Sequence, residues 1–115
     1  MFRLPFLPAA ILILAGLAAP ARASDPAVTL FKVVTVKDEI VIGLTPAELA
    51  RIGASDAGAV ARTIAANGEM TAWQYAVRKG STGELQQAPL RRIGILANGS
   101  LRVEPYATPL TVVAP

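Results

Sequence analysis

The hydrophobic and polar positions along this chain change their period twice, near residue 45 and again near Gly68. Residues 28–37 (VTLFKVVTVK) and residues 40–44 (IVIGL) are two β-branched runs separated by Asp38 and Glu39. Two such runs joined by a short polar turn predict a β-hairpin. The acidic pair is interpreted as a solvated turn rather than a cation site, because calcium requires six or more oxygen ligands.

A helical signal follows the second run. Thr45 suits a helix N-cap, Pro46 suits the first helical position, and Glu48 stands three residues after the cap. This capping-box pattern predicts a short helix over residues 46–52. Gly53 is expected to end the helix, because glycine adopts the left-handed conformation without steric cost.

A second helix is expected directly afterwards, with Ser55 as its cap and Asp56 in its first turn. Its apolar stripe at helical spacing consists of Ala57, Val60, Ala61 and Ile64, and Asn67-Gly68 ends it. We therefore predict that the two helices form a helical hairpin, with Arg51 and Arg62 facing water.

Beyond Gly68 the period becomes that of a strand. Residues 70–79 (MTAWQYAVRK) alternate, with Trp73 and Tyr75 on one face. This aromatic face is interpreted first as a cover for the core, and the alternative is a binding surface, since Trp and Tyr join an apolar body to a polar group. Residues 85–90 form a weaker extended stretch, with Pro89 at an edge or bend.

Asn98-Gly99 favours a two-residue type I′ hairpin, because both central positions of that turn need positive φ. In that register Leu96 faces Leu101, and the opposite face of the hairpin carries four polar or aromatic side chains: Arg91, Arg102, Glu104 and Tyr106. These four are the candidate contact surface, together with Trp73 and Tyr75. The alternative is an ordinary half-solvated sheet face. Residues 110–114 are expected to add a last edge strand.

These elements together predict an α+β fold: a small antiparallel sheet with a two-helix hairpin packed on one face. Residues 24–115 are long enough for a single modest core, so we expect one domain.

The N-terminal residues have the pattern of an export signal. A short positive start with Arg3 precedes an apolar run over residues 4–19, and Ala21-Arg22-Ala23 fits a signal peptidase. The predicted cleavage lies between Ala23 and Ser24, which makes residues 1–23 a signal peptide and the protein periplasmic or secreted. The alternative is an uncleaved membrane anchor, although the run is shorter than the roughly 20 residues of a spanning helix.

Charge and composition exclude several classes of function. Arg3 and Arg22 belong to the leader, so the other basic residues nearly balance the 8 acidic ones. The net charge that remains is too small to attract nucleic acid or an anionic membrane. The chain has no His and no Cys. It therefore lacks the usual general base, the thiolate nucleophile and the commonest transition-metal ligands, so we expect no cofactor and no metal.

Three segments carry a resemblance to other proteins: residues 31–49 (FKVVTVKDEIVIGLTPAEL), residues 73–77 (WQYAV) and residues 101–106 (LRVEPY). With them the chain resembles short exported bacterial proteins of unknown function. The resemblance implies the compartment and the size, and it implies no activity, cofactor or catalytic residue.

The function expected from the sequence is a non-enzymatic, exported interaction module that binds an envelope protein or a small ligand. One alternative is a carboxylate-dependent envelope hydrolase, for which two carboxylates must face one substrate. Its candidate residues are Glu39, Glu69, Glu84 and Glu104. The other alternative is a membrane-tethered scaffold, if the leader is retained.

Overall fold

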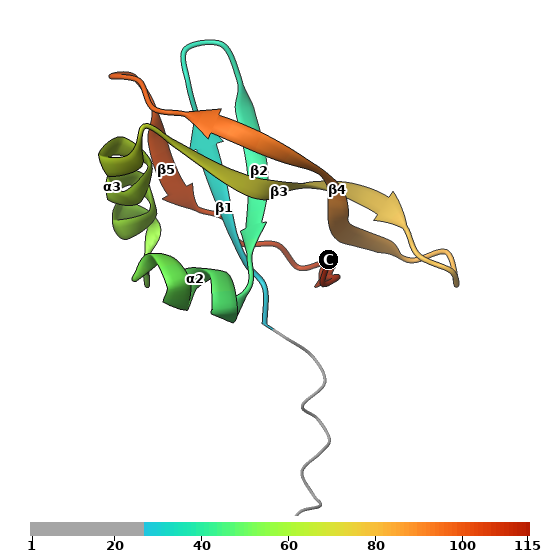
Figure 1. Cartoon of the computed structure of the whole chain (residues 1–115). Coiled ribbons are helices and arrows are strands. Elements are labelled where there is room, and N and C mark those ends of the chain that lie inside the picture. The colour runs from blue at the N-terminus through green and yellow to red at the C-terminus, as the bar shows by residue number, and fades with distance from the viewer. Residues whose placement is uncertain (1–26) are drawn as a thin grey trace, which may run out of the picture.

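The computed structural model describes residues 27–115, so the predicted leader and its cleavage site lie outside the described residues (Figure 1). Six strands and two helices follow one another in this part of the chain. In chain order they are β1 (Thr29–Val34), β2 (Glu39–Leu44), α2 (Pro46–Ile52), α3 (Ala57–Asn67), β3 (Glu69–Lys79), β4 (Leu85–Leu96), β5 (Arg102–Pro105) and β6 (Thr111–Val112).

The predicted fold class, a small antiparallel sheet carrying a two-helix hairpin, is wrong. The strands form one six-stranded mixed sheet in the order β5-β1-β2-β3-β4-β6, in which β6 runs parallel to β4. The helices do not pack as a hairpin unit, since α2 contacts β2 while α3 contacts β3 and β5. The difference arises because the C-terminal segment supplies both edge strands, and no local pattern specifies that their partners are β1 and β4.

The β1–β2 hairpin forms as predicted, with Val33 opposite Ile40 and Phe31 opposite Ile42. Its turn is closed by the backbone bond from Thr35 N–H to the Asp38 carbonyl at 2.8 Å. Glu39 belongs to β2 rather than to the turn.

Both helices begin and end on local signals. Thr45 and Glu48 form the predicted capping box, and Gly53 ends α2 at φ 69°. The N-cap of α3 is Asp56 rather than the expected Ser55, because the Asp56 carboxylate accepts the Ala59 N–H at 2.8 Å. Gly68 ends α3 at φ 84°.

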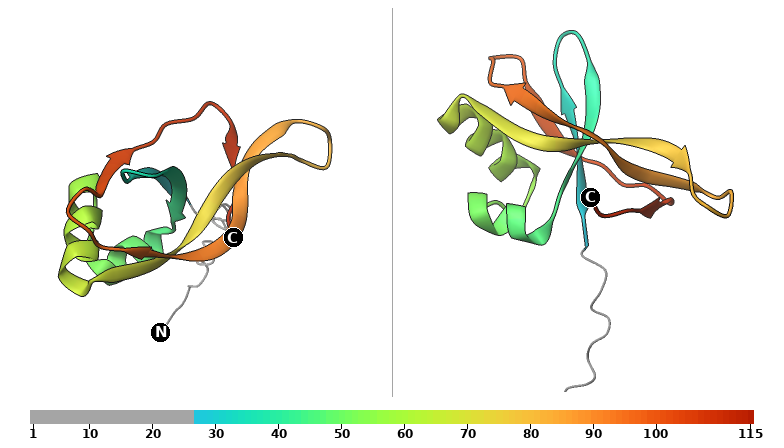
Figure 2. Two further views of the ribbon diagram at one scale, coloured as in Figure 1. Left: turned by 90° about the horizontal axis from the view of Figure 1, so that it is seen from above. Right: turned by 45° about the vertical axis from the view of Figure 1, so that its right-hand side comes forward.

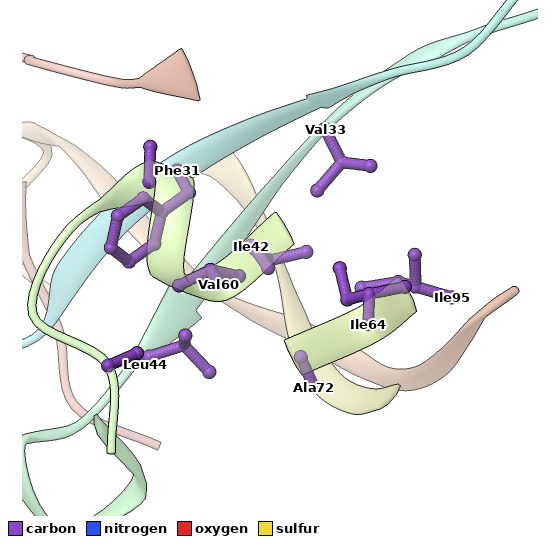
Figure 3. Packing of buried hydrophobic residues seen from close by; sticks show 10 residues of the cluster. Phe31, Val33, Ile42, Leu44, Val60, Ile64, Ala72 and Ile95 are labelled. Atoms are coloured by element: carbon purple, nitrogen blue, oxygen red, sulfur yellow. The ribbon is translucent and has the colours of Figure 1, made fainter. Parts of the chain in front are cut away.

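The core lies between α3 and the face of the sheet that α3 covers (Figure 3). Val60 and Ile64 of α3 are fully buried against side chains from four strands. The labelled members of this cluster are Phe31, Val33, Ile42, Leu44, Val60, Ile64, Ala72 and Ile95. The residue of β3 that belongs to this cluster is Ala72, on the face opposite Trp73.

The β3–β4 hairpin is the longest ladder of the sheet, and its far end projects from the body (Figure 1). The register shifts by one residue between Gln74 and Tyr75, which leaves Leu90 of β4 as a bulge next to Pro89. This position explains how a single strand contains the proline, since bulges and edges tolerate a missing N–H.

The predicted pairing of β4 with β5 is wrong. A turn does form, with Leu101 N–H donating to the Asn98 carbonyl at 3.2 Å, but β5 leaves β4 and pairs with β1. Gly99 is not among the glycines with positive φ, so the turn lacks the type I′ geometry that twists two strands into a hairpin. Pairing with β1 places Val103 opposite the buried Val33.

The chain after β5 connects the two edges of the sheet (Figure 2). It leaves the β1 side, where Tyr106 N–H donates to the Leu30 carbonyl, and reaches β4, where Val113 N–H donates to the Gln87 carbonyl at 2.8 Å. The predicted last edge strand is thus present as the short β6.

Candidate functional site: an open cavity beside the end of β4

The predicted contact residues do not share one surface. Arg102 and Glu104 lie on β5 at one edge of the sheet, opposite Val34 and Lys32 of β1. Arg91 lies on β4 opposite Gln74, with three strands between it and β5. The predicted pairing of β4 with β5, which would have placed these side chains on one face, is absent, so they form separate groups.

Trp73 is half-buried and forms part of a small polar cluster. The Arg92 guanidinium lies 5.6 Å from the centroid of the Trp73 ring, which is cation–π distance. Arg92 Nη1 also lies 3.5 Å from Glu48 Oε2, so the cluster connects β4 to the first turn of α2. The cation is thus already balanced by a carboxylate, and the cluster holds elements together.

Tyr75 is buried, with 3 % of its surface exposed. Its ring covers Gly43 of β2, and its hydroxyl donates to the Val113 carbonyl at 2.6 Å. Burial, and secondarily the Glu48 carboxylate, raise the pKa of Tyr75 above its usual value. Tyr75 therefore fastens the C-terminal segment to the sheet.

Two of the candidate hydrolase carboxylates meet at a lysine. Glu39 and Glu104 lie 3.7 and 3.9 Å from Lys32 Nζ. A hydrogen bond from Arg102, with the charges of Arg102 and Lys32, lowers the pKa of Glu104. A glycosidase general acid needs a raised pKa, so the lowered pKa of Glu104 does not suit that role.

The cavity that the structure offers is elsewhere, between the tip of the β1–β2 hairpin and the end of β4. Its volume is about 270 Å³, and it is open to solvent. Its apolar lining residues are Val33, Ile40, Ile95, Leu96 and Leu101, its polar ones are Thr35, Asp38 and Asn98, and Gly94 completes the lining. Val33 and Ile95 belong to the core cluster, so the cavity opens directly onto the core.

The polar side chains at the cavity differ in whether their hydrogen-bonding or charged groups already have a partner. The Thr35 hydroxyl accepts the N–H groups of Lys37 and Asp38, and Asn98 Oδ1 accepts from Ser100. The Asp38 carboxylate is exposed, and it forms no ion pair among residues 27–115. Asp38 is thus the charged group that remains available to a ligand.

Sequence reasoning missed this cavity because its walls come from segments more than fifty residues apart. The gap between them exists because β5 leaves β4 at the Asn98 turn and crosses to β1. The one local signal was Gly94, a glycine within an apolar run, which often marks a close backbone approach or an open space in a sheet.

Within residues 27–115 no helix is long and apolar enough to cross a membrane, and no group of three or more His, Cys, Asp or Glu side chains gathers at one point.

Comparison with protein-family models, curated proteins and solved structures finds no match to this chain.

Proposed function

We propose that this chain is a non-enzymatic binding module whose ligand site is the cavity between the β1–β2 hairpin tip and the end of β4. The observation that carries the proposal is the lining: an apolar floor continuous with the core and one available carboxylate, Asp38, at the rim. Binding sites are typically apolar with a few placed polar groups that orient the ligand.

The chemistry of the lining favours binding over catalysis. Acid–base catalysis by carboxylates of the glycosidase type needs a pair, and Asp38 is the single carboxylate among the lining residues. The Thr35 hydroxyl is held by backbone groups of its own turn rather than by a base that would activate it.

The size of the cavity limits what it accepts. Drug-sized ligands occupy pockets of about 300–1,000 Å³, whereas a cavity of about 150 Å³ already holds benzene. A volume of about 270 Å³ therefore suits one branched apolar group, and Asp38 at the rim suits a cation attached to that group.

The proposed location is the cell envelope or the exterior, and it is supported by the export pattern in residues 1–23. In that compartment the partner would be an envelope component.

An NMR titration with three five-carbon probes tests the proposed function: 3-methylbutylamine, 3-methylbutanol and 3-methylbutanoate. We expect amide shifts to cluster at Val33, Ile40, Ile95 and Leu101, with the amine binding most tightly. Asp38→Asn should remove the advantage of the amine over the alcohol. Glu39→Gln, which changes a neighbouring carboxylate outside the cavity, should keep that advantage. Shifts scattered over the surface, or none at tens of millimolar probe, would contradict the proposal.

A further inference from the structure

We propose that the natural occupant of the cavity is an extended segment of a partner polypeptide, which adds as a strand to the free edge of β4 at Gly94 and Leu96. The segment inserts one apolar side chain into the cavity and places a lysine or arginine against Asp38. This inference rests on the proposed function, because it names the ligand of that site.

The direction of the backbone groups of β4 follows from the hydrogen bonds at the two ends of its ladder with β3. Ala97 N–H donates to the Gly68 carbonyl at 2.9 Å, in the same register that pairs Ile95 with Met70. In an antiparallel ladder, hydrogen-bonded pairs alternate with pairs whose N–H and C=O groups point away from the partner strand. The backbone groups of Ile93 and Ile95 therefore face β3, whereas those of Gly94 and Leu96 face outward.

The far end of β4 has the same alternation beyond the bulge. Gly80 N–H donates to the Glu84 carbonyl, and the outward Gln87 carbonyl accepts the Val113 N–H of the C-terminal segment. Pro89 also occupies an outward position, where its missing N–H costs no ladder bond. The outward edge of β4 is thus occupied near residue 87 and lacks a donor at residue 89.

The stretch that follows is protected against pairing in two further ways. Leu90 is the bulge, and the next outward residue, Arg92, carries a charge held by Glu48. Bulges, prolines and charges are the usual devices that prevent edge strands from pairing. These devices end at Arg92. Among residues 27–115 no backbone group bonds to the outward groups of Gly94 and Leu96, so this part of the edge, which also lines the cavity, is open to a new strand.

Strand addition would place side chains in the cavity by simple alternation. A residue paired with Gly94 or Leu96 directs its side chain to the solvent-exposed face of the sheet, where Leu96 lies. The residue between them directs its side chain to the core face. On that face lie Ile95, Val33 and the cavity. One apolar residue of the segment therefore fills the cavity, and a residue two positions away on the same face reaches its rim at Asp38.

A second copy of this chain fits the site less well. If two β4 edges paired, the residue facing the cavity would be the copy's own Ile95, which is 5 % exposed and packed in its own core. The outward residue Gly94 has no side chain to offer. A foreign segment fills the cavity, and a second copy leaves it empty.

The test compares two peptides on the full protein by calorimetry and NMR. The first is acetyl-Thr-Ile-Thr-Lys-Thr-amide, in which isoleucine and lysine share a face. The second is the same peptide with the two threonines beside isoleucine N-methylated, so that the side chains stay and the strand hydrogen bonds are lost. We expect at least tenfold weaker binding of the methylated peptide, which corresponds to about 1.4 kcal/mol. Asp38→Asn should weaken the first peptide and Glu39→Gln should not.

A variant of the protein tests the same contact from the other side. Gly94→Pro removes an outward N–H without removing a β3–β4 bond, as Pro89 already does in this strand. It should weaken the first peptide tenfold and abolish the advantage of that peptide over the methylated one. Because the methylated peptide is tested on the unaltered protein, the inference remains falsifiable if this variant fails to fold.

The outcomes separate the inference from the proposed function. Equal binding of both peptides would overturn strand addition and leave the cavity as a ligand site. If neither peptide binds but 3-methylbutylamine does, the inference alone fails. If none of the three binds, both proposals fail. A dimer that the first peptide does not dissociate would make a second copy the occupant and would overturn the inference.

Discussion

The contact between Gly43 of β2 and Tyr75 of β3 determines how the C-terminal segment attaches to the sheet. The Tyr75 ring lies so close to Gly43 that a side-chain carbon at residue 43 would overlap it. The buried ring presents its hydroxyl to the C-terminal segment. The absence of a side chain at Gly43 thus allows the tyrosine to join β3 to a segment that is distant in sequence.

Gly43→Ala is therefore expected to destabilise the protein. Overpacking of this kind costs about 1–3 kcal/mol, because the ring or the backbone must shift. Gly94→Ala is the matched control, since a side-chain carbon there meets open space, and it should be neutral or slightly stabilising. Urea unfolding at neutral pH measures both, and an equal loss of stability in the two variants would contradict this account.

Tyr75→Phe should lose the bond to Val113, at a cost of about 0.5–1.5 kcal/mol at neutral pH. The folded protein also raises the pKa of Tyr75 above its usual 10.0, so the unfolded chain loses that proton first as pH rises. The stabilisation is complete below pH 10 and falls as pH rises from 10 through the folded-state value. Unfolding free energies measured from pH 8 to pH 11 should therefore fall less in Tyr75→Phe than in the wild type. A parallel fall in the two proteins would contradict the assignment.

At the scale of elements, local signals determined where most strands and helices begin and end. The β-branched runs of the first hairpin, the Thr45 capping box and the glycines at 53 and 68 all act through neighbouring residues. Ser55 and Asp56 are both good caps, and only the backbone geometry decides that Asp56 is used.

The partner of β5 could not be predicted in this way. Asn98-Gly99 favours a local hairpin, but the gain from pairing with β1 is non-local: Val103 joins the core margin and Glu104 faces Lys32. The sheet order, the position of β6 and the cavity all follow from that choice. The candidate site was not predicted from the sequence: none of the six expected contact residues lines the cavity, and Asp38 was interpreted as part of a solvated turn.

The first turn of α2 is held to the sheet by Glu48. Its Oε1 accepts the Thr45 N–H at 2.9 Å and its Oε2 lies 3.5 Å from Arg92. Because one carboxylate serves both contacts, the helix cap and the connection to β4 are coupled.

Two substitutions at Glu48 should separate these contacts. Glu48→Gln keeps an acceptor for the cap and loses the ion pair, a cost of about 1 kcal/mol or less. Glu48→Ala loses both contacts and should cost about 1–2 kcal/mol. Glu69→Ala, at an exposed carboxylate without an ion pair among residues 27–115, should stay within about 0.5 kcal/mol. Denaturant unfolding tests the order, and equal effects of Gln and Ala would show that the cap contributes nothing.

At the scale of the whole molecule, the C-terminal segment determines which part of the outward edge of β4 has a strand partner. The C-terminal segment supplies β5 at one edge and β6 at the other, and it is fastened through Tyr75 and Gln87 (Figure 2). Pro89, the bulge and Arg92 protect the next part of β4. The open remainder at Gly94 and Leu96 adjoins the cavity, and this coincidence supports the view that the region is a binding site.

The most direct test of this account is amide hydrogen exchange along β4 in the free protein. The exchange of Ile93 and Ile95 should be slow, because their N–H groups bond to β3, and that of Gly94 and Leu96 should be fast. Adding the unmethylated peptide should slow Gly94 and Leu96 alone. Equal protection of all four amides in the free protein would mean that the edge is already occupied, and it would contradict the account.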